Sequence, residues 1–394
     1  MNRLLLSVLL FGYGIAMAAT DQGLVKPKIM ILANFPPEEK IWHDIPDFDI
    51  LARPVTVPGI SPLYPKVHCT SDGDICKMST GLGQVNAATT MAALVYSGMF
   101  DLTQTYFLIA SIAGINPTVG TLNSVVFSRY VVQIALQYEF DIRDLPENYT
   151  TGYIPLGSKA PGEYPRIAYG TEVFELNASL RDMVMQIASQ VELGDSEVSK
   201  KYRAKYAANP EYKAAAQPPR VFAGDCVEGD NFWTGRMLSE AFSNYTKLIT
   251  NGTGVYTTTA MEDAGTLNPL LRAAKLELVD FGRIILMRAA SNFDRPPPGR
   301  TAAQHKFWTD EGSFESSLGN VRRCGLRIIQ NILQNWDSRF SAGIPAKNYI
   351  GDILGTLGGK RDFGPEKFGY NPILDEVEDD NPMPDAHSDG KDEL

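Results

Sequence analysis

The hydrophobic positions of this chain form short, dense runs that are separated by glycine turns and by alanine-rich segments. Runs of this length, rich in β-branched and aromatic residues, predict buried strands, whereas the longer segments predict helices that pack on a sheet. The alternation of the two predicts an α/β fold with a mixed central sheet flanked by helices. The expected strands cover residues 27–33, 77–83, 106–110, 125–135, 221–225, 255–261 and 283–290, and the expected helices cover 85–99, 179–190, 197–216 and 322–340.

The helical segment at 197–216 differs from the others because it is highly charged and ends at Pro218 and Pro219. We interpret the region of about 190–220 as a helical insertion. With 394 residues, 44% of them hydrophobic, the chain is long and apolar enough for one large domain. We expect this domain to span residues 27–370.

The N-terminus has the pattern of a secretory leader. Arg3 supplies a positive charge, residues 4–16 are apolar, and Ala16-Met17-Ala18 is a small-x-small cleavage pattern. The apolar run is shorter than the roughly 20 residues that a membrane span needs. The sequence therefore predicts a signal peptide over 1–18, with a single membrane anchor as the alternative. We expect no other transmembrane span.

The C-terminus carries a second targeting signal. Residues 371–394 are acidic and end in Lys391-Asp392-Glu393-Leu394, a retrieval signal of the endoplasmic reticulum. If this signal is native, the lumen of that compartment is the expected location; if it is an added tag, the protein is expected to be secreted. If the chain enters the secretory pathway, we also expect glycosylation among its Asn-x-Ser/Thr sites, which are Asn148, Asn177, Asn244 and Asn251.

The cysteines predict one disulfide. Cys69 and Cys76 flank a turn-rich segment, so they are expected to close a hairpin, with two buried thiols as the alternative. The spacing of Cys226 and Cys324 leaves open whether they pair or stay free.

Charge and motif content exclude several functions. A net charge of -10 argues against binding to a nucleic-acid backbone, which needs clustered lysine and arginine. The 4 histidines are scattered, so no metal site is expected, and no cofactor is expected either. The chain lacks the Gly-x-Ser-x-Gly, His-Glu-x-x-His and Walker motifs. A small ligand in a pocket remains compatible with this charge.

Loops at the ends of the expected strands are candidates for one ligand site, because ligands of α/β sheets bind at the carboxyl ends of strands. These loops contain the glycines Gly81, Gly83 and Gly114, and also residues 231–233, 261–262 and 291–294.

Six segments, in this order, resemble the fungal purine nucleoside permease family within the nucleoside phosphorylase and nucleosidase superfamily. The resemblance extends from Lys28 to about Gly355 and implies a single nucleoside phosphorylase-like domain and a purine nucleoside ligand. The segments are STGLGQVNAA (79–88), IAGINP (112–117), YEFDIR (138–143), EGDNFWTG (228–235), AMEDAG (260–265) and RAASNFDRP (288–296).

The resemblance implies roles for residues on the sugar and the base. Glu262 aligns with the acid that grips the ribose diol, beside Met261; the alternative for Glu262 is pairing with a helix N-terminus. Phe232 and Trp233 match the position where an aromatic ring stacks on the base, and the alternative is two core aromatics.

The resemblance also locates the acid that protonates the departing base. Many relatives carry an aspartate where this chain has Asn292, and an amide cannot deliver a proton as an acid. Asp294 could take that role if the loop is shifted; the alternative is a carboxylate paired with Arg295.

The nucleophile is the remaining question. Ile109 and Ile112 occupy positions where phosphate ligands are expected in phosphorylases, and an apolar wall cannot compensate for the desolvation of phosphate. Hydrolytic relatives place a glutamate near the end of the first strand to activate water. Glu38 aligns best, followed by Glu39, and the alternative is that both are ordinary acids at a helix start.

The sequence therefore favours a purine nucleoside hydrolase acting on adenosine, inosine or guanosine and releasing free base and ribose. The alternatives are a phosphorylase that releases ribose 1-phosphate, a nucleoside-binding protein that assists uptake, a storage protein on the same fold, or a different hydrolase. From the superfamily we expect a homo-oligomer.

Overall fold

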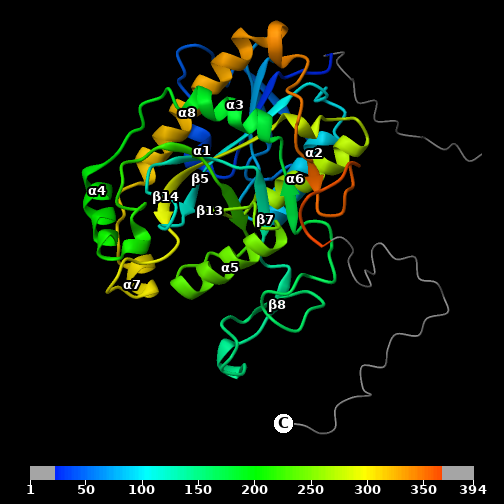
Figure 1. Cartoon of the computed structure of the whole chain (residues 1–394). Coiled ribbons are helices and arrows are strands. Elements are labelled where there is room, and N and C mark those ends of the chain that lie inside the picture. The colour runs from blue at the N-terminus through cyan, green and yellow to red at the C-terminus, as the bar shows by residue number, and fades with distance from the viewer. Residues whose placement is uncertain (1–22, 366–394) are drawn as a thin grey trace, which may run out of the picture.

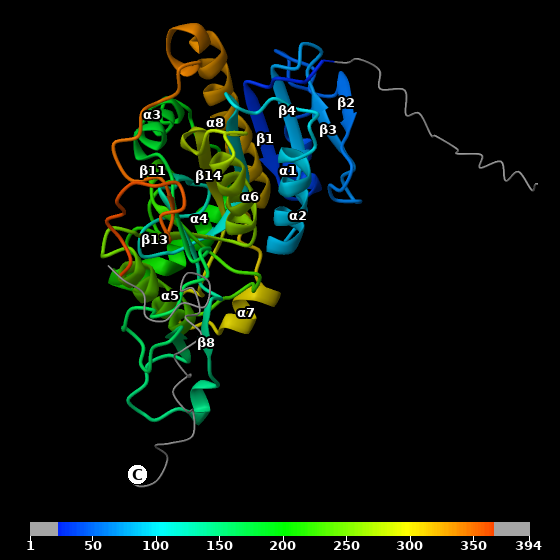
Figure 2. The same ribbon diagram turned by 90° about the vertical axis from the view of Figure 1, so that its right-hand side faces the viewer.

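The computed structural model describes residues 23–365, and Figures 1 and 2 show it in two views. The expected leader at 1–18 and the acidic tail at 371–394 lie outside the described residues, as does the end of the expected domain at 366–370.

The centre of the molecule is a 13-stranded mixed sheet. Its main path has the order β15-β10-β7-β12-β13-β5-β1-β4-β3-β2, while β14 pairs with β5 and β6, and β6 pairs with β11. The strands are β1 (Ile29–Ala33), β2 (Arg53–Thr56), β3 (Lys66–Cys69), β4 (Ile75–Ser79), β5 (Tyr106–Ile115), β6 (Val125–Phe127), β7 (Tyr130–Gln133), β10 (Val173–Glu175), β11 (Val221–Ala223), β12 (Asp225–Glu228), β13 (Tyr256–Ala260), β14 (Ile284–Phe293) and β15 (Gly351–Asp352).

Helices cover both faces of this sheet (Figure 1). The α-helices are α1 (Pro36–Lys40), α2 (Gln84–Val95), α3 (Ala178–Ala188), α4 (Glu197–Arg203), α5 (Arg236–Ile249), α6 (Asp263–Lys275), α7 (Ala302–Phe307) and α8 (Phe314–Gln334). Shorter turns are η1 (Ile142–Asp144), η2 (Ala204–Ala208), η3 (Pro210–Tyr212), η4 (Phe281–Arg283) and η5 (Trp336–Phe340). The expected α/β fold class, a mixed sheet flanked by helices, is confirmed.

The period-two alternation of β1 explains the layers. Met30 and Leu32 belong to the core shared with α2 and α6, whereas Ile29 and Ile31 belong to the core shared with α3 and α8. Because successive side chains of a strand point to opposite faces, a strand buried on both sides must be apolar at every position. All five residues of β1 are buried accordingly.

Outside the sheet, β8 (Gln137–Glu139) and β9 (Tyr153–Pro155) form an antiparallel pair. Figures 1 and 2 show that the segment around β8 projects from the main body of the molecule.

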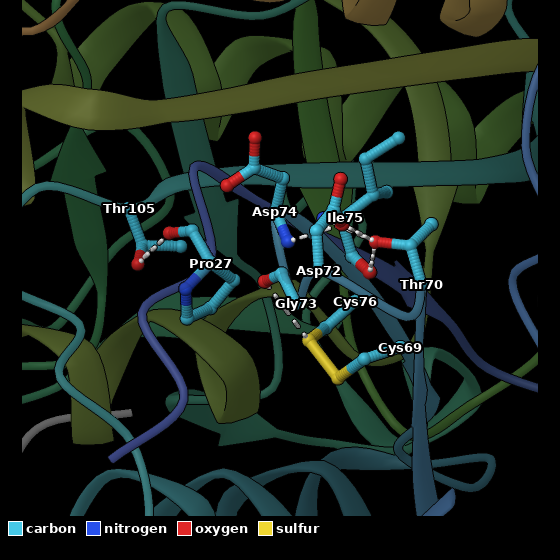
Figure 3. The surroundings of a disulfide bond; sticks show 9 residues. All are labelled: Pro27, Cys69, Thr70, Asp72, Gly73, Asp74, Ile75, Cys76 and Thr105. Carbon is cyan, nitrogen blue, oxygen red and sulfur yellow. Dashed lines mark hydrogen bonds between the residues drawn. A yellow bond between two sulfur atoms is a disulfide. The ribbon is translucent and has the colours of Figure 1, made fainter. Parts of the chain in front are cut away.

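The hairpin formed by β3 and β4 contains the expected disulfide. Cys69 and Cys76 face each other across the two strands and are bonded (Figure 3). Thr70 and Asp72 hydrogen-bond within the connecting turn, and the Asp74 N–H donates to Asp72 Oδ1 (3.0 Å). Cys226 and Cys324 are free and buried.

Several expected elements have other bounds in the structure, and two of them are divided into separate elements with a clear cause or consequence. The strand expected at 125–135 is split into β6 and β7, and the two pair with different neighbours. The helix expected at 197–216 is only α4, followed by the 3₁₀ turns η2 and η3. The break between η2 and η3 falls at Asn209, which precedes Pro210 and has extended backbone, because proline disfavours helical geometry in the residue before it.

Candidate functional site

A cavity of about 270 Å³ lies at the ends of β1, β5, β13 and β14. It brings together the strand-end loops that the sequence singled out. Its size is close to the lower end of small-ligand pockets, about 300 Å³. The wall consists of Asn34, Phe35, Glu38, Leu82, Ile112, Ala113, Gly114, Asn231, Phe232, Trp233, Thr259, Ala260, Met261, Glu262, Arg288, Ser291 and Asn292.

Glu38 is held in this wall by the short helix α1, which begins with Pro36 and Pro37. Its side chain is only 1% exposed. The Asn34 N–H donates to Oε2 (2.9 Å) and the Ile112 N–H donates to Oε1 (2.8 Å). Burial raises the pKa of Glu38 to about 7, and the Arg288 charge and these two N–H groups oppose that rise. Both protonation states of Glu38 are therefore populated near neutral pH, as a proton-transferring group requires.

Glu39, the second candidate for the base, is outside the cavity wall. Its carboxylate pairs with the buried Lys77 ammonium, which also contacts His43 Nε2 (2.8 Å). The two neighbouring glutamates of α1 therefore differ in surroundings: Glu38 lines the cavity, whereas Glu39 forms an ion pair with the buried Lys77.

Glu262 enters the cavity from the start of α6. Its carboxylate accepts from Asn34 Nδ2 (3.2 Å) and from the Gly83 N–H (3.2 Å). Glu262 is the N-cap residue of α6, and its side chain makes no cap hydrogen bond to that helix. Burial raises its pKa and the Arg288 charge opposes that rise. Met261 lies beside it in the wall.

Arg288 is a cavity residue to which the sequence reasoning gave no role. It is fully buried in β14, where it donates to Ile112 O (3.1 Å) and pairs with Asp263. Its guanidinium lies 3.9 Å from Glu262 Oε2. A single charged residue in the apolar run 284–290 was the signal in the sequence that could have found it.

Asn34 was also missed, and it links several parts of the site. Its amide donates to Ser111 Oγ (3.0 Å) and to Glu262, while Thr80 Oγ1 donates to Asn34 Oδ1 (3.0 Å). Asn34 and Glu262 are 228 positions apart in the sequence, so no local pattern could reveal this contact.

The two predicted base-binding aromatics have different surroundings. Phe232 is 54% exposed and offers a ring at the edge of the cavity, with Lys306 Nζ 3.4 Å from its centroid. Trp233 is buried, donates to Tyr256 OH (3.1 Å) and packs against Phe242. Phe232 is thus an exposed wall residue with the Lys306 ammonium over its ring, whereas Trp233 lines the wall and also belongs to the core.

Asn292 and Asp294 are separated by the structure. Asn292 lies in the wall, where its amide accepts from Ser291 Oγ (3.2 Å). Asp294 is outside the wall and buried; it pairs with Arg295 (2.9 Å) and accepts from Tyr256 OH (2.6 Å). The surroundings of Asp294 are therefore those of the alternative, a carboxylate paired with Arg295, and not those of an acid facing a ligand.

Of the three predicted site glycines, only Gly114 lies in the wall itself. A Cβ at Gly114 would come within 2.3 Å of Thr259 Oγ1, so a side chain here would clash with the Thr259 side chain. Gly83 has a φ of +86°, which favours glycine, and its N–H binds Glu262. Gly81, with a φ of +89°, shapes the same turn without reaching the cavity.

Within residues 23–365 we find no helix long and apolar enough to cross a membrane. The same part of the chain contains no group of three or more His, Cys, Asp or Glu side chains placed to hold a metal ion.

Comparison with known proteins gives one matching family and related fungal chains. A profile of the purine nucleoside permease family matches residues 26–345. A purine nucleoside permease of Candida albicans is 42% identical over 351 residues, covering 88% of this chain and 85% of that protein. A probable purine nucleoside permease of Schizosaccharomyces pombe is 36% identical, covering 80% of this chain and 91% of that protein.

Among solved structures, a 5'-methylthioadenosine/S-adenosyl homocysteine nucleosidase of Helicobacter pylori superposes with a TM-score of 0.46 and 14% identity. The superposition covers 79% of this chain and 100% of the nucleosidase. The family assignment rests on the sequence matches alone.

Proposed function

Because the chain belongs to the purine nucleoside permease family, we propose that its cavity binds a purine nucleoside and cleaves the N-glycosidic bond with water, releasing free base and ribose. The observation that carries the proposal is the convergence of two buried carboxylates, Glu38 and Glu262, beside an exposed aromatic ring, Phe232, in one cavity.

Glu262 is the group proposed for the sugar. Cleavage of the bond builds positive charge on the ribose, and a carboxylate placed beside that charge stabilises the transition state more than the ground state. Asn34 and the Gly83 N–H fix the orientation of Glu262 before a ligand arrives. Its oxygens can accept hydrogen bonds from the ribose hydroxyls, with Met261 packed against the sugar.

Phe232 is the group proposed for the base. A purine has a broad π face, and base-aromatic stacking contributes about 1–3 kcal/mol per base. The amide of Asn292, in the same wall, can donate a hydrogen bond to a ring nitrogen of the base.

Glu38 is the proposed general base. In its ionised form it takes a proton from a water molecule as the water oxygen bonds to the anomeric carbon. A pKa of about 7 suits this task, because the group is basic enough to accept the proton and still largely ionised at slightly alkaline pH.

The charges of the cavity favour water over phosphate. The wall contains Glu38 and Glu262, and its single arginine, Arg288, is already paired with Asp263. Ile112 adds apolar surface at the position where phosphate ligands are expected. A phosphate dianion would lose its hydration and face two carboxylates without a free cation in that wall.

A second candidate function is nucleoside binding without cleavage, in support of uptake. Two observations favour it: the fungal relatives carry the name permease, and the residue at position 292 is an amide that cannot supply a proton to the leaving base.

The experiment is calorimetric titration of the full chain with inosine, adenosine, guanosine and uridine, followed by chromatography for free base. The proposal expects binding of the purine nucleosides over uridine and release of base. Glu262→Gln should lower kcat/KM, whereas Glu147→Gln, in an exposed loop, is the matched control. Binding without release would favour the uptake function, and no binding of any purine nucleoside would contradict both.

A further inference from the structure

A second cavity, of about 360 Å³, adjoins the first. The two share Ile112, Phe232, Ser291 and Asn292 as wall residues. Two of the shared residues, Phe232 and Asn292, are those proposed to contact the base, whereas Glu38, Glu262 and Arg288 line the first cavity only. The second cavity therefore begins at the base end of the proposed nucleoside site.

The wall of this second cavity contains two acidic residues, Asp310 and Glu311. The Glu311 side chain is 11% exposed. The Phe293 N–H donates to Oε2 (2.8 Å), which fixes the carboxyl next to the residue that follows Asn292. The remaining oxygen, Oε1, has His305 Nε2 at 3.6 Å, beyond a normal hydrogen bond. One oxygen of Glu311 is thus anchored, and the other is available to a ligand.

We propose that Glu311 is the acid that protonates the departing purine, the role that the amide of Asn292 cannot fill. This inference rests on the proposed function, because it assigns a step of the same cleavage. Asn292 then orients the base by hydrogen bonding, and Glu311 supplies the proton from the adjoining cavity.

As the bond between the anomeric carbon and the base nitrogen breaks, its electron pair moves to the purine. The proton of the Glu311 carboxyl passes to a nitrogen of the imidazole part of the purine. The water oxygen bonds to the anomeric carbon, and its proton passes to Glu38. After release, Glu38 returns a proton to solvent and Glu311 takes one up, so nucleoside and water give base and ribose.

The protonation state of Glu311 supports this role. Burial raises its pKa to about 8, opposed by the Phe293 N–H and the Lys306 charge, while Asp294 and Asp310 raise it further. The carboxyl therefore carries its proton at neutral pH and loses it as the pH rises through about 8. The imidazole of His305 has a lowered pKa because of burial. The titratable or charged groups around Glu311 are Tyr202, Tyr206, Asp294, His305, Lys306 and Asp310.

The test compares Glu311→Gln with the wild type on two substrates, inosine and 7-methylinosine. Methylation at N7 gives the imidazole ring a positive charge, so this base can leave without a proton. We expect kcat for inosine to fall by about 100-fold, and kcat for 7-methylinosine to change little. Glu315→Gln, an exposed carboxyl in the first turn of α8, is the matched control and should match the wild type on both.

An equal loss on both substrates, or no loss on either, would overturn the assignment. A wild type that cleaves neither substrate would instead contradict the proposed function itself. If Glu311→Gln does not fold, the pH profile of the wild type decides: the decline above about pH 8 should appear with inosine and be absent with 7-methylinosine. A decline shared by both substrates would also overturn the assignment.

Discussion

Neighbouring carboxylates of α1 give the most direct residue-level test of the chemistry. Glu38→Gln removes the proposed base, and we expect turnover of purine nucleosides to fall by about 100-fold or more. Glu39→Gln should keep turnover and lower stability instead, since Lys77 loses its carboxylate partner. Turnover by chromatography and unfolding by circular dichroism separate the two effects. A Glu38→Gln variant with wild-type turnover would exclude Glu38 as the base.

The pKa of Glu38 predicts the acid side of the pH profile. The base must be ionised to take a proton from water, and burial raises its pKa from 4.5 to about 7. We therefore expect kcat/KM for inosine to rise tenfold per pH unit below about pH 7. Above about pH 8 it should decline again as Glu311 loses its proton. The measurement is initial velocity at low substrate from pH 5 to pH 9. A rate that stays flat down to pH 5 would mean that no base with this raised pKa is required.

Substitution of Phe232 separates the binding of the base, measured by KM, from bond cleavage, measured by kcat. Loss of a stacking platform costs about 1–3 kcal/mol, so Phe232→Ala should raise KM by about 5- to 150-fold and change kcat less. Phe307, an exposed aromatic of α7 outside both cavity walls, is the control. Steady-state kinetics on inosine provides the comparison. Equal KM values for the two alanine variants would contradict the stacking role.

The sequence placed Glu38, Glu262, Met261, Phe232 and Asn292 in one site because each belongs to a local segment with family character, and the structure brings these five residues into one cavity wall. It could not find the residues whose roles depend on distant partners. Asn34 acts through contacts with Ser111 and Glu262, and Arg288 through Asp263. Such contacts exist only after the sheet has formed.

At the scale of elements, apolar runs predicted the inner strands because the sheet is covered on both faces. They missed β2, β3, β10 and β15, which lie at the two ends of the main path. A further error arose where pairing changes along a run. β6 pairs with β14 and β11, whereas β7 pairs with β10 and β12. One β-branched run therefore forms two strands at different positions in the sheet. The boundary between them, at Ser128-Arg129, has no turn signal in the sequence.

The disulfide links β3 and β4, the two strands that precede the edge strand β2 in the order of the sheet. Closing a loop of this length restricts the unfolded chain and contributes about 2–3 kcal/mol. Replacing both Cys69 and Cys76 by alanine should lower the free energy of unfolding by about that amount. Neither residue lies in the cavity wall, so kcat should not change. Urea unfolding and turnover are the measurements; unchanged stability would contradict the expected contribution.

At the scale of the whole molecule, the asparagines of the four glycosylation sequons differ in exposure and in hydrogen bonding. Asn148 and Asn244 are exposed. Asn177 is buried at the start of α3, where its amide donates to Gly282 O and Ile344 O. The Asn251 amide is hydrogen-bonded to Asp362 O (3.1 Å). A glycan at Asn177 would have to replace these buried hydrogen bonds, so folded protein should lack it.

We propose that the chain enters the secretory pathway, and these differences make the proposal testable. Expressed with its leader in a eukaryotic host, the protein should carry glycans at Asn148 and Asn244 and none at Asn177. Mass spectrometry of peptides after enzymatic deglycosylation gives the occupancy. A fully unmodified chain would contradict secretory entry, and an occupied Asn177 in folded protein would contradict its placement in α3.

The measurement that tests the central claim most directly is product analysis with the purified chain and inosine, run with and without phosphate. The arrangement of Glu38, Glu262 and the paired Arg288 predicts hypoxanthine and free ribose at the same rate in both buffers. Base released only with phosphate, together with ribose 1-phosphate, would contradict hydrolysis and the inference that the charges of the cavity favour water over phosphate. Intact inosine in both buffers would contradict the claim that this cavity is catalytic.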